Sequence, residues 1–327
     1  MNKGIVLLVI LAATVLLIGC GTQQQTSTGT AFIGGTEGLR TTFLPGSPPD
    51  RTTDGGTSGF SIVVKAENVG ENNVNANDGY VQIWGLDANT YGSNIPDFRK
   101  YFNQQQGFGT ELRSAVMNFD GSVLNGGVAT IDFGDLRYMP TIQGDIQQKV
   151  WANICYRYTT RATTQLCVKN NVEQAFSGKQ ICEVEGEKNP QNSGAPIHVT
   201  SLKESYAGNG RLGLTLTIEH VGNGDNFFMD NVLNCNDVES NLDRGKVRVV
   251  FRDVQISGRN VPVTCQGLGD GYIRLFKDSS GRETTTLYCT VDVSGSSNVV
   301  QVPLDVSLSY AYLQHVERDL TIRHITQ

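Results

Sequence analysis

The sequence has few charges, few histidines and no long helical pattern. Charged residues make up 18% of its 327 residues, the net charge is −6, and no run of lysine and arginine occurs. Nucleic-acid-binding proteins depend on basic patches, so this pattern argues against nucleic acid as a partner. The chain has neither a His-Glu-x-x-His nor a Gly-x-Ser-x-Gly motif. We therefore expect no catalytic residues and no cofactor; an enzyme would need two or more histidines to meet carboxylates in one cleft, from among His198, His220, His315 and His324.

Motifs that bind metals are also missing. The cysteines show no Cys-x-x-Cys or Cys-x-x-His spacing, which argues against zinc. Residues 73–79 are rich in asparagine, but Asp78 stands at the sixth position, where an EF-hand loop has glycine. We expect no metal site, with calcium at three loop carboxylates as the open alternative: Asp225, Asp230 and Asp237.

What the sequence does contain begins with an export signal. Lys3 is followed by an apolar run over residues 5–18, which suits the apolar region of a secretory signal and is short for a spanning helix. The run ends in Leu17-Ile18-Gly19-Cys20, which resembles a lipobox, the site where prokaryotic lipoproteins are cut before a lipid-carrying cysteine. The resemblance implies lipid attachment at Cys20 and a tether on the extracytoplasmic face of the cell membrane. An uncleaved signal anchor over residues 1–20 and simple secretion are the alternatives.

The segment after Cys20 has the composition of a linker. Residues 21–30 carry no charge and little apolar content. Such a segment cannot bury enough surface to offset the entropy of ordering it. We expect a flexible spacer over residues 21–36 that holds a folded body off the membrane.

The rest of the chain has the pattern of short strands. Its 37 glycines and many asparagines suit tight turns. Apolar and polar residues alternate over residues 60–66 and again over 212–218, as in strands that bury one face. The sequence therefore predicts an all-β fold.

The strand pattern repeats once along the chain. Val-Gly pairs at 69–70 and 221–222 follow the two alternating segments and are 152 residues apart. Tyr-x-Tyr motifs at 156–158 and 310–312 recur at an offset of 154. Two copies of one unit explain both spacings.

We predict two tandem immunoglobulin-like antiparallel β-sandwich domains. The first spans residues 37–182 and the second spans 195–327, with a polar linker at 183–194. The copies differ most near 87–127, where we expect an inserted loop with a short helix.

A turn in the first copy carries a family resemblance. Asn68-Val69-Gly70 is similar to the Asn-x-Gly turn of the cell-adhesion-related domain family of prokaryotic surface proteins, whereas His220-Val221-Gly222 departs from that pattern. The resemblance implies a non-catalytic role in adhesion, envelope structure or interaction. The membrane is the expected partner, and other surface proteins or glycans are candidates. The alternatives are a solute- or glycan-binding lipoprotein, with a pocket near 95–116, and a subunit of a surface layer or filament, with 38–44 as a donor strand.

Six cysteines follow the predicted signal, and an even number in an exported chain suggests disulfides. Apolar residues alternate over 150–158 and 166–168, and a turn around Arg161 would close these segments into a hairpin. Cys155 would then lie opposite Cys167, at a distance that suits a disulfide.

The other four cysteines are paired with less information. Cys265 and Cys289 flank a second expected hairpin, so we pair them. Cys182 and Cys235 then pair by elimination.

Two groups of aromatic residues are candidates for binding. Phe98, Tyr101 and Phe102 share one face of the expected short helix, where they could contact a partner or cap the sandwich as buried residues. The burial of an apolar stripe at helical spacing is the favoured alternative. The Tyr-x-Tyr motifs at 156–158 and 310–312 recur with inward parity, so we expect them in the core.

Overall fold

The computed structural model describes most of the chain after residue 29. The predicted signal and Cys20 lie outside the described residues, as does the spacer up to residue 29. Contacts group Ala31–Gln327 into one compact unit, separate from Met1–Thr30. No helix in the described part of the chain is both long and apolar enough to cross a membrane. The described residues are 30–95, 97–104, 111–169, 181–228, 230, 235, 243–294, 296 and 299–325.

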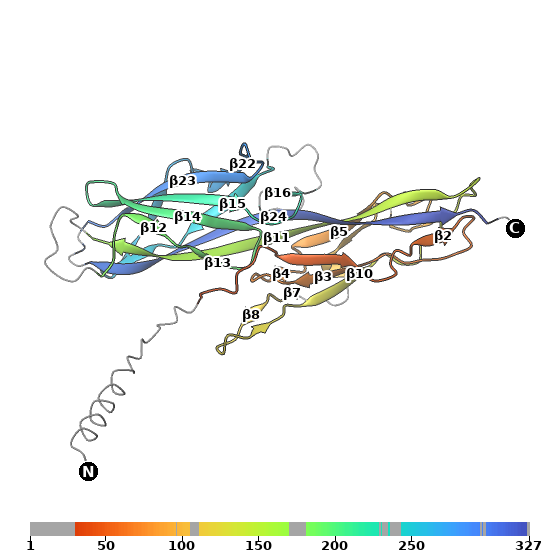
Figure 1. Cartoon of the computed structure of the whole chain (residues 1–327), viewed down its shortest axis with the longest axis horizontal. Coiled ribbons are helices and arrows are strands. Elements are labelled where there is room, and N and C mark those ends of the chain that lie inside the picture. The colour runs from red at the N-terminus through yellow and green to blue at the C-terminus, as the bar shows by residue number, and fades with distance from the viewer. Residues whose placement is uncertain are drawn as a thin grey trace, which may run out of the picture. The chain divides into compact units, whose positions relative to one another are not determined.

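Two very long strands form the centre of the compact unit. Strands β11 (Ile146–Val168) and β24 (Val300–Arg323) pair antiparallel over 23 positions, with Tyr156 opposite Tyr312. They lie side by side through the whole unit (Figure 1). Shorter strands extend this sheet on both sides, in the order β21-β17-β24-β11-β5-β6. Their bounds are β5 (Gly79–Trp84), β6 (Arg99–Tyr101), β17 (Lys246–Phe251) and β21 (Tyr272–Arg274).

Two smaller sheets each contain three neighbouring antiparallel strands, one sheet from each predicted repeat. One sheet has the order β1-β3-β10, and the other contains β14-β15-β23. Leu39 pairs with Asn68 in the first and Ile197 with His220 in the second, so equivalent strands pair in equivalent register. The all-β prediction is therefore confirmed. The bounds are β1 (Leu39–Phe43), β3 (Val63–Asn68), β10 (Val128–Asp132), β14 (Ile197–Tyr206), β15 (Arg211–His220) and β23 (Glu283–Asp292).

Each repeat ends in a strand that serves both halves of the compact unit. Residues 151–156 of β11 pair with β5 from the same repeat, while residues 158–168 run on beside 300–310 of β24. In return, β17 pairs with 306–309 of β24, and the rest of β24 continues beside 146–157. The predicted units 37–182 and 195–327 are thus joined through their last strands.

One face of the long sheet is buried and largely apolar over most of its length. The even-numbered residues of β11 are buried from Val150 to Val168, and those of β24 are buried from Val302 to Tyr312. Because neighbouring side chains point to opposite faces of a strand, both smaller sheets cover the same face.

The shorter strands are β2 (Arg51–Thr53), β4 (Val74–Asn75), β7 (Glu111–Leu112), β8 (Val116–Met117), β9 (Val123–Leu124), β12 (Gly186–Lys188), β13 (Gln191–Asn192), β16 (Asn226–Phe228), β18 (Val254–Ile256), β19 (Arg259–Val261), β20 (Val263–Cys265) and β22 (Phe276–Lys277), with one 3₁₀ turn, η1 (Phe102–Gln104).

The long strand corrects the predicted disulfides. No turn forms at Arg161, so Cys155 and Cys167 are about 40 Å apart along β11, at roughly 3.3 Å per residue. The predicted turn was wrong because Thr160 and Ala162 continue the alternation of inward-facing side chains. No glycine, proline or asparagine interrupts the strand there. Both Cys155–Cys167 and Cys182–Cys235 are wrong, and Cys265–Cys289 is confirmed. The disulfides are Cys155–Cys235, Cys167–Cys182 and Cys265–Cys289.

Two of the disulfides, Cys155–Cys235 and Cys265–Cys289, should differ in their effect on stability. We expect Cys155→Ala with Cys235→Ala to lower the free energy of unfolding by about 4.5 kcal/mol, and Cys265→Ala with Cys289→Ala by about 3.4 kcal/mol, from the entropy of closing the two loops. The paired cysteines are 80 and 24 residues apart. Denaturation of the full chain, followed by circular dichroism, measures both. The reverse order would contradict the assignment, and peptide mapping without reduction checks the pairs directly.

Candidate functional site

Four tyrosines pack together at the middle of the two paired long strands, where each strand passes from one half of the compact unit to the other. We call this place the crossing. Tyr156, Tyr158, Tyr310 and Tyr312 are at most 1% exposed, so the prediction that they lie in the core is confirmed. Their rings pack edge to face at centroid distances of 5.7–6.2 Å, which is a favourable arrangement for aromatic rings. Burial raises the pKa of each hydroxyl, so all four remain neutral hydrogen-bonding groups.

The tyrosine hydroxyls hold the turns that end β3 and β15. The Asn72 amide donates to the Tyr158 hydroxyl at 3.1 Å, and this hydroxyl donates to Asn68 at 3.2 Å. In the second repeat the Gly224 amide donates to the Tyr312 hydroxyl at 2.7 Å, and His220 Nε2 lies 2.9 Å from it. His220 thus takes the place of Asn68, although it departs from the sequence pattern.

This contact also explains the repeated Val-Gly pair. A Cβ at Gly70 would lie 2.2 Å from the Tyr158 hydroxyl, and one at Gly222 would lie 2.5 Å from the Tyr312 hydroxyl. Any side chain there would displace the tyrosine. The glycines therefore serve close packing at the crossing.

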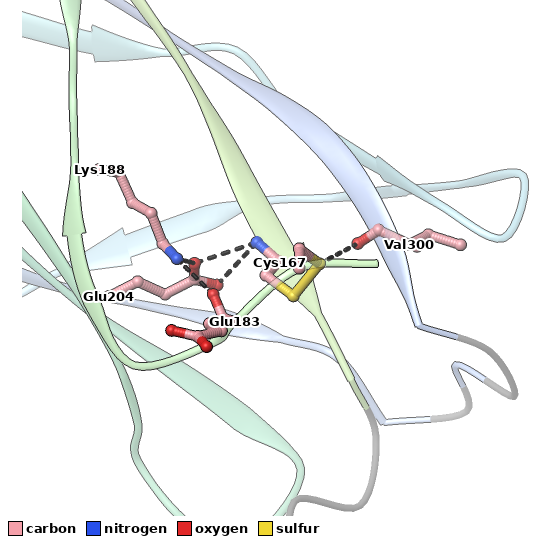
Figure 2. The surroundings of a disulfide bond; sticks show 6 residues. Cys167, Glu183, Lys188, Glu204 and Val300 are labelled. Atoms are coloured by element: carbon pink, nitrogen blue, oxygen red, sulfur yellow. Dashed lines mark hydrogen bonds and ion pairs between the residues drawn. A yellow bond between two sulfur atoms is a disulfide. The ribbon is translucent and has the colours of Figure 1, made fainter. Parts of the chain in front are cut away.

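A buried carboxyl lies beside the Cys167–Cys182 disulfide (Figure 2). Both oxygens of Glu204 accept from the Cys167 amide, at 3.0 and 3.1 Å, and Lys188 Nζ lies 3.2 Å away. Burial raises the pKa of Glu204 to about 7, more than these two partners lower it. This contact joins β14 to β11 behind the disulfide.

The proposed binding loop forms a strand and a 3₁₀ turn instead of a helix. Phe98 and Phe102 are buried, so the alternative that they belong to the core is confirmed. Phe102 lies against Gly79, where a Cβ would come within 2.1 Å of its ring. Tyr101 pairs with Tyr80 across β5 and β6, with ring centroids 5.8 Å apart. The helix prediction failed because the apolar spacing also suits an edge strand followed by a tight turn.

Three histidines each bind a different carboxylate. His220 lies 3.0 Å from Glu283, and this hydrogen bond lowers the pKa of Glu283. The other two pairs are His315 with Asp225, at 2.6 Å, and His324 with Asp54, at 2.7 Å.

The acidic loop residues also have protein partners. Asp230 accepts from Arg248 and from the Tyr272 hydroxyl, both at 2.8 Å. Asp237, the third carboxylate of the calcium alternative, lies outside the described residues. Within the part of the chain that the structure describes, no three His, Cys, Asp or Glu side chains are grouped as metal ligands.

Two surface depressions lie away from residues 95–116, where the solute- or glycan-binding alternative expected a pocket. One of about 390 Å³ lies beside β19 and β20, with Arg211, Arg259 and Asp292 at its wall. Another of about 520 Å³ lies beside β2 and is lined in part by Phe60. The candidate donor strand, residues 38–44, contains β1, which is paired with β3 at the edge of its own sheet.

The sequence interpretation missed an exposed apolar hairpin. Among the described residues, strands β8 and β9 pair only with each other, and they lie in the region where the predicted repeats differ most. The signal that could have revealed the hairpin is two apolar pairs, Val116-Met117 and Val123-Leu124, on both sides of an Asp-Gly turn. Its exposed large apolar residues are Val116, Met117, Phe119, Val123 and Leu124.

Comparison with known proteins adds little. No protein-family model matches the chain, and no curated protein is similar to it in sequence. Among solved structures it is similar to a serine-rich repeat adhesion glycoprotein (Srr1) from Streptococcus agalactiae, at 9% identity and a TM-score of 0.16, covering 89% of this chain and 97% of that one. A TM-score this low carries no argument about fold or function.

Removing one hydroxyl at the crossing should destabilise the protein. We expect Tyr312→Phe to lower the free energy of unfolding by about 1–3 kcal/mol, because the Gly224 amide loses its acceptor. The exposed Tyr288 is the control, and Tyr288→Phe should change stability by no more than about 0.5 kcal/mol. Equal effects in the two variants, measured by chemical denaturation, would contradict the role of the crossing.

Glu204 should titrate near neutral pH. Its pKa in the folded chain lies above the ordinary value of 4.5, so the folded state binds more protons than the unfolded state between these values. The stabilisation of the fold that comes from binding a proton at Glu204 is fully present below pH 4.5 and is lost as the pH rises through about 7. We expect Glu204→Gln to make the free energy of unfolding less dependent on pH over this range. NMR of the side-chain carboxyl carbon gives the midpoint directly, and exposed Glu185→Gln is the control; a midpoint near 4.5 would refute the assignment.

Proposed function

We propose that this chain is a membrane-tethered surface protein on the extracytoplasmic side, with a non-catalytic role in adhesion, envelope structure or interaction. The observation that carries the proposal is the set of three disulfides within one all-β unit. Disulfides persist in oxidising compartments outside the cytoplasm. The lipobox-like sequence ending at Cys20 supports the same location.

The construction of the compact unit supports a mechanical or presenting role. The last strand of each repeat runs through both halves, so separating the halves would break the pairing of β11 with β24. The Cys155–Cys235 disulfide ties the middle of β11 to the second repeat. Such a body keeps its two ends at a fixed distance and orientation. This rigidity suits a surface module better than it suits a binding protein that closes about a hinge.

The non-catalytic part of the proposal is supported by how the ionisable groups are used. Histidine-carboxylate pairs join neighbouring elements of the fold: Glu283 of β23 binds His220 of the adjacent β15, and Asp54, just after β2, binds His324, just after β24. Their hydrogen bonds lower the pKa of both carboxyls, that of Asp54 to about 2, which keeps both carboxylates ionised at neutral pH. We therefore infer that these histidine-carboxylate pairs stabilise the fold by linking its elements.

Intact mass of the chain extracted from its membrane tests the tether. We expect a mature form that begins at Cys20 and carries added diacylglyceryl mass, and Cys20→Ser should lose that mass. A form that begins at Met1 would mean a signal anchor and a tether without lipid. A free chain without lipid would overturn the tether, and digestion of intact cells by an external protease would then report which side of the membrane the body occupies.

A further inference from the structure

The β8–β9 hairpin exposes apolar side chains on both of its faces. Val116 lies opposite Leu124 and Met117 opposite Val123, while Phe119 lies fully exposed in the turn. Because consecutive residues of a strand point to opposite faces, each face of the hairpin carries apolar groups. Figure 1 shows the hairpin projecting from the body. A contiguous apolar patch at a projecting site marks an interaction surface.

The turn of the hairpin is well defined. The Asn118 amide donates to the Ser122 carbonyl at 2.8 Å, and Gly121 has a φ of +83°, which favours glycine. The Asp120 carboxylate accepts from the Ser122 amide at 2.9 Å and from its hydroxyl at 2.6 Å. The only charge in the turn is therefore partly satisfied by the turn itself, and Phe119 is presented beside it.

The base of the hairpin lies where the compact unit begins. The Ala115 amide, just before β8, donates to the Gly70 carbonyl at 2.9 Å. The next residue, Glu71, accepts from the Ile33 and Gly34 amides at 2.9 Å each. One short path of hydrogen bonds thus links the hairpin to Ile33 and Gly34, which lie in the predicted spacer but already belong to the compact unit.

The length of the chain before residue 31 limits the distance to the membrane. Ten residues separate Cys20 from Ala31. Even fully extended, they span at most about 35 Å. The hairpin base is tied to the end of this segment, so a tether at Cys20 keeps the hairpin within reach of the bilayer.

We infer that the β8–β9 hairpin docks into the surface of the lipid bilayer that holds the N-terminal tether. The inference rests on the proposed tether. Lipid surrounds an inserted hairpin on all sides, which matches apolar residues on both faces, whereas a flat protein surface would cover one face. Aromatic side chains such as Phe119 are favoured at the boundary between headgroups and acyl chains. Arg113, whose side chain is 83% exposed at the hairpin base and lies 3.8 Å from Glu111, stands where headgroup phosphates would lie.

Fluorescence quenching in vesicles tests the docking. The full chain, Phe119→Trp and Phe276→Trp are reconstituted into phosphatidylcholine vesicles that carry bromine on the upper part of the acyl chains. Phe276 is an exposed phenylalanine of the second repeat, so it is a matched control. After subtraction of the native tryptophans, we expect bromine to quench the tryptophan at 119 roughly twofold or more over the tryptophan at 276, as insertion to the headgroup boundary predicts. Unchanged circular dichroism confirms that both variants fold.

Flotation of the same vesicles separates the two proposals. Flotation of all three proteins with selective quenching at 119 supports docking. Flotation with equal quenching at both positions leaves the tether in place and overturns docking. Failure to float overturns the tether and the docking that rests on it. A tryptophan emission shift at 119 that depends on protein concentration and not on lipid would assign the hairpin to a second copy of this chain and also overturn docking.

Discussion

The antiparallel pairing of β11 with β24 holds the compact unit together. It joins the last strands of two repeats over 23 positions and keeps inward parity along the whole length. Both smaller sheets can therefore cover one continuous apolar face. A bulge in either strand would turn the remaining side chains to the other face and expose the core of one half.

The crossing point is sealed by polar contacts that would be costly to leave unmade. The tyrosine hydroxyls accept amides from the turns after β3 and β15, and the glycines at 70 and 222 leave room for them. Glu71 also accepts the Gly194 amide at 2.7 Å, so the segment between the repeats joins the same site. Buried polar groups need such partners because desolvation is not otherwise offset. The repeats are thus locked at their crossing as well as along their strands.

The region around residue 71 links this architecture to the proposed location. The start of the compact unit, the segment between the repeats and the base of the exposed hairpin all contact Gly70 or Glu71. The first residues of the compact unit are therefore bonded to the same region as the base of the hairpin. The depression beside β19 and β20 belongs to the second repeat.

The strand class, the burial of the tyrosines and the pair Cys265–Cys289 could be predicted from the sequence, because alternation and close spacing are local properties. The sequence also contains the lipobox-like end at Cys20, which lies outside the described residues. The tertiary structure decided the partners of Cys155 and Cys167, the strand conformation of residues 99–101 and the exposure of Phe119. Residues 159–163 suit a turn or a strand equally well, and only pairing with β24 selects the strand. Local propensity is weaker than the burial gained by that long-range pairing, so the sequence pattern could not choose between them.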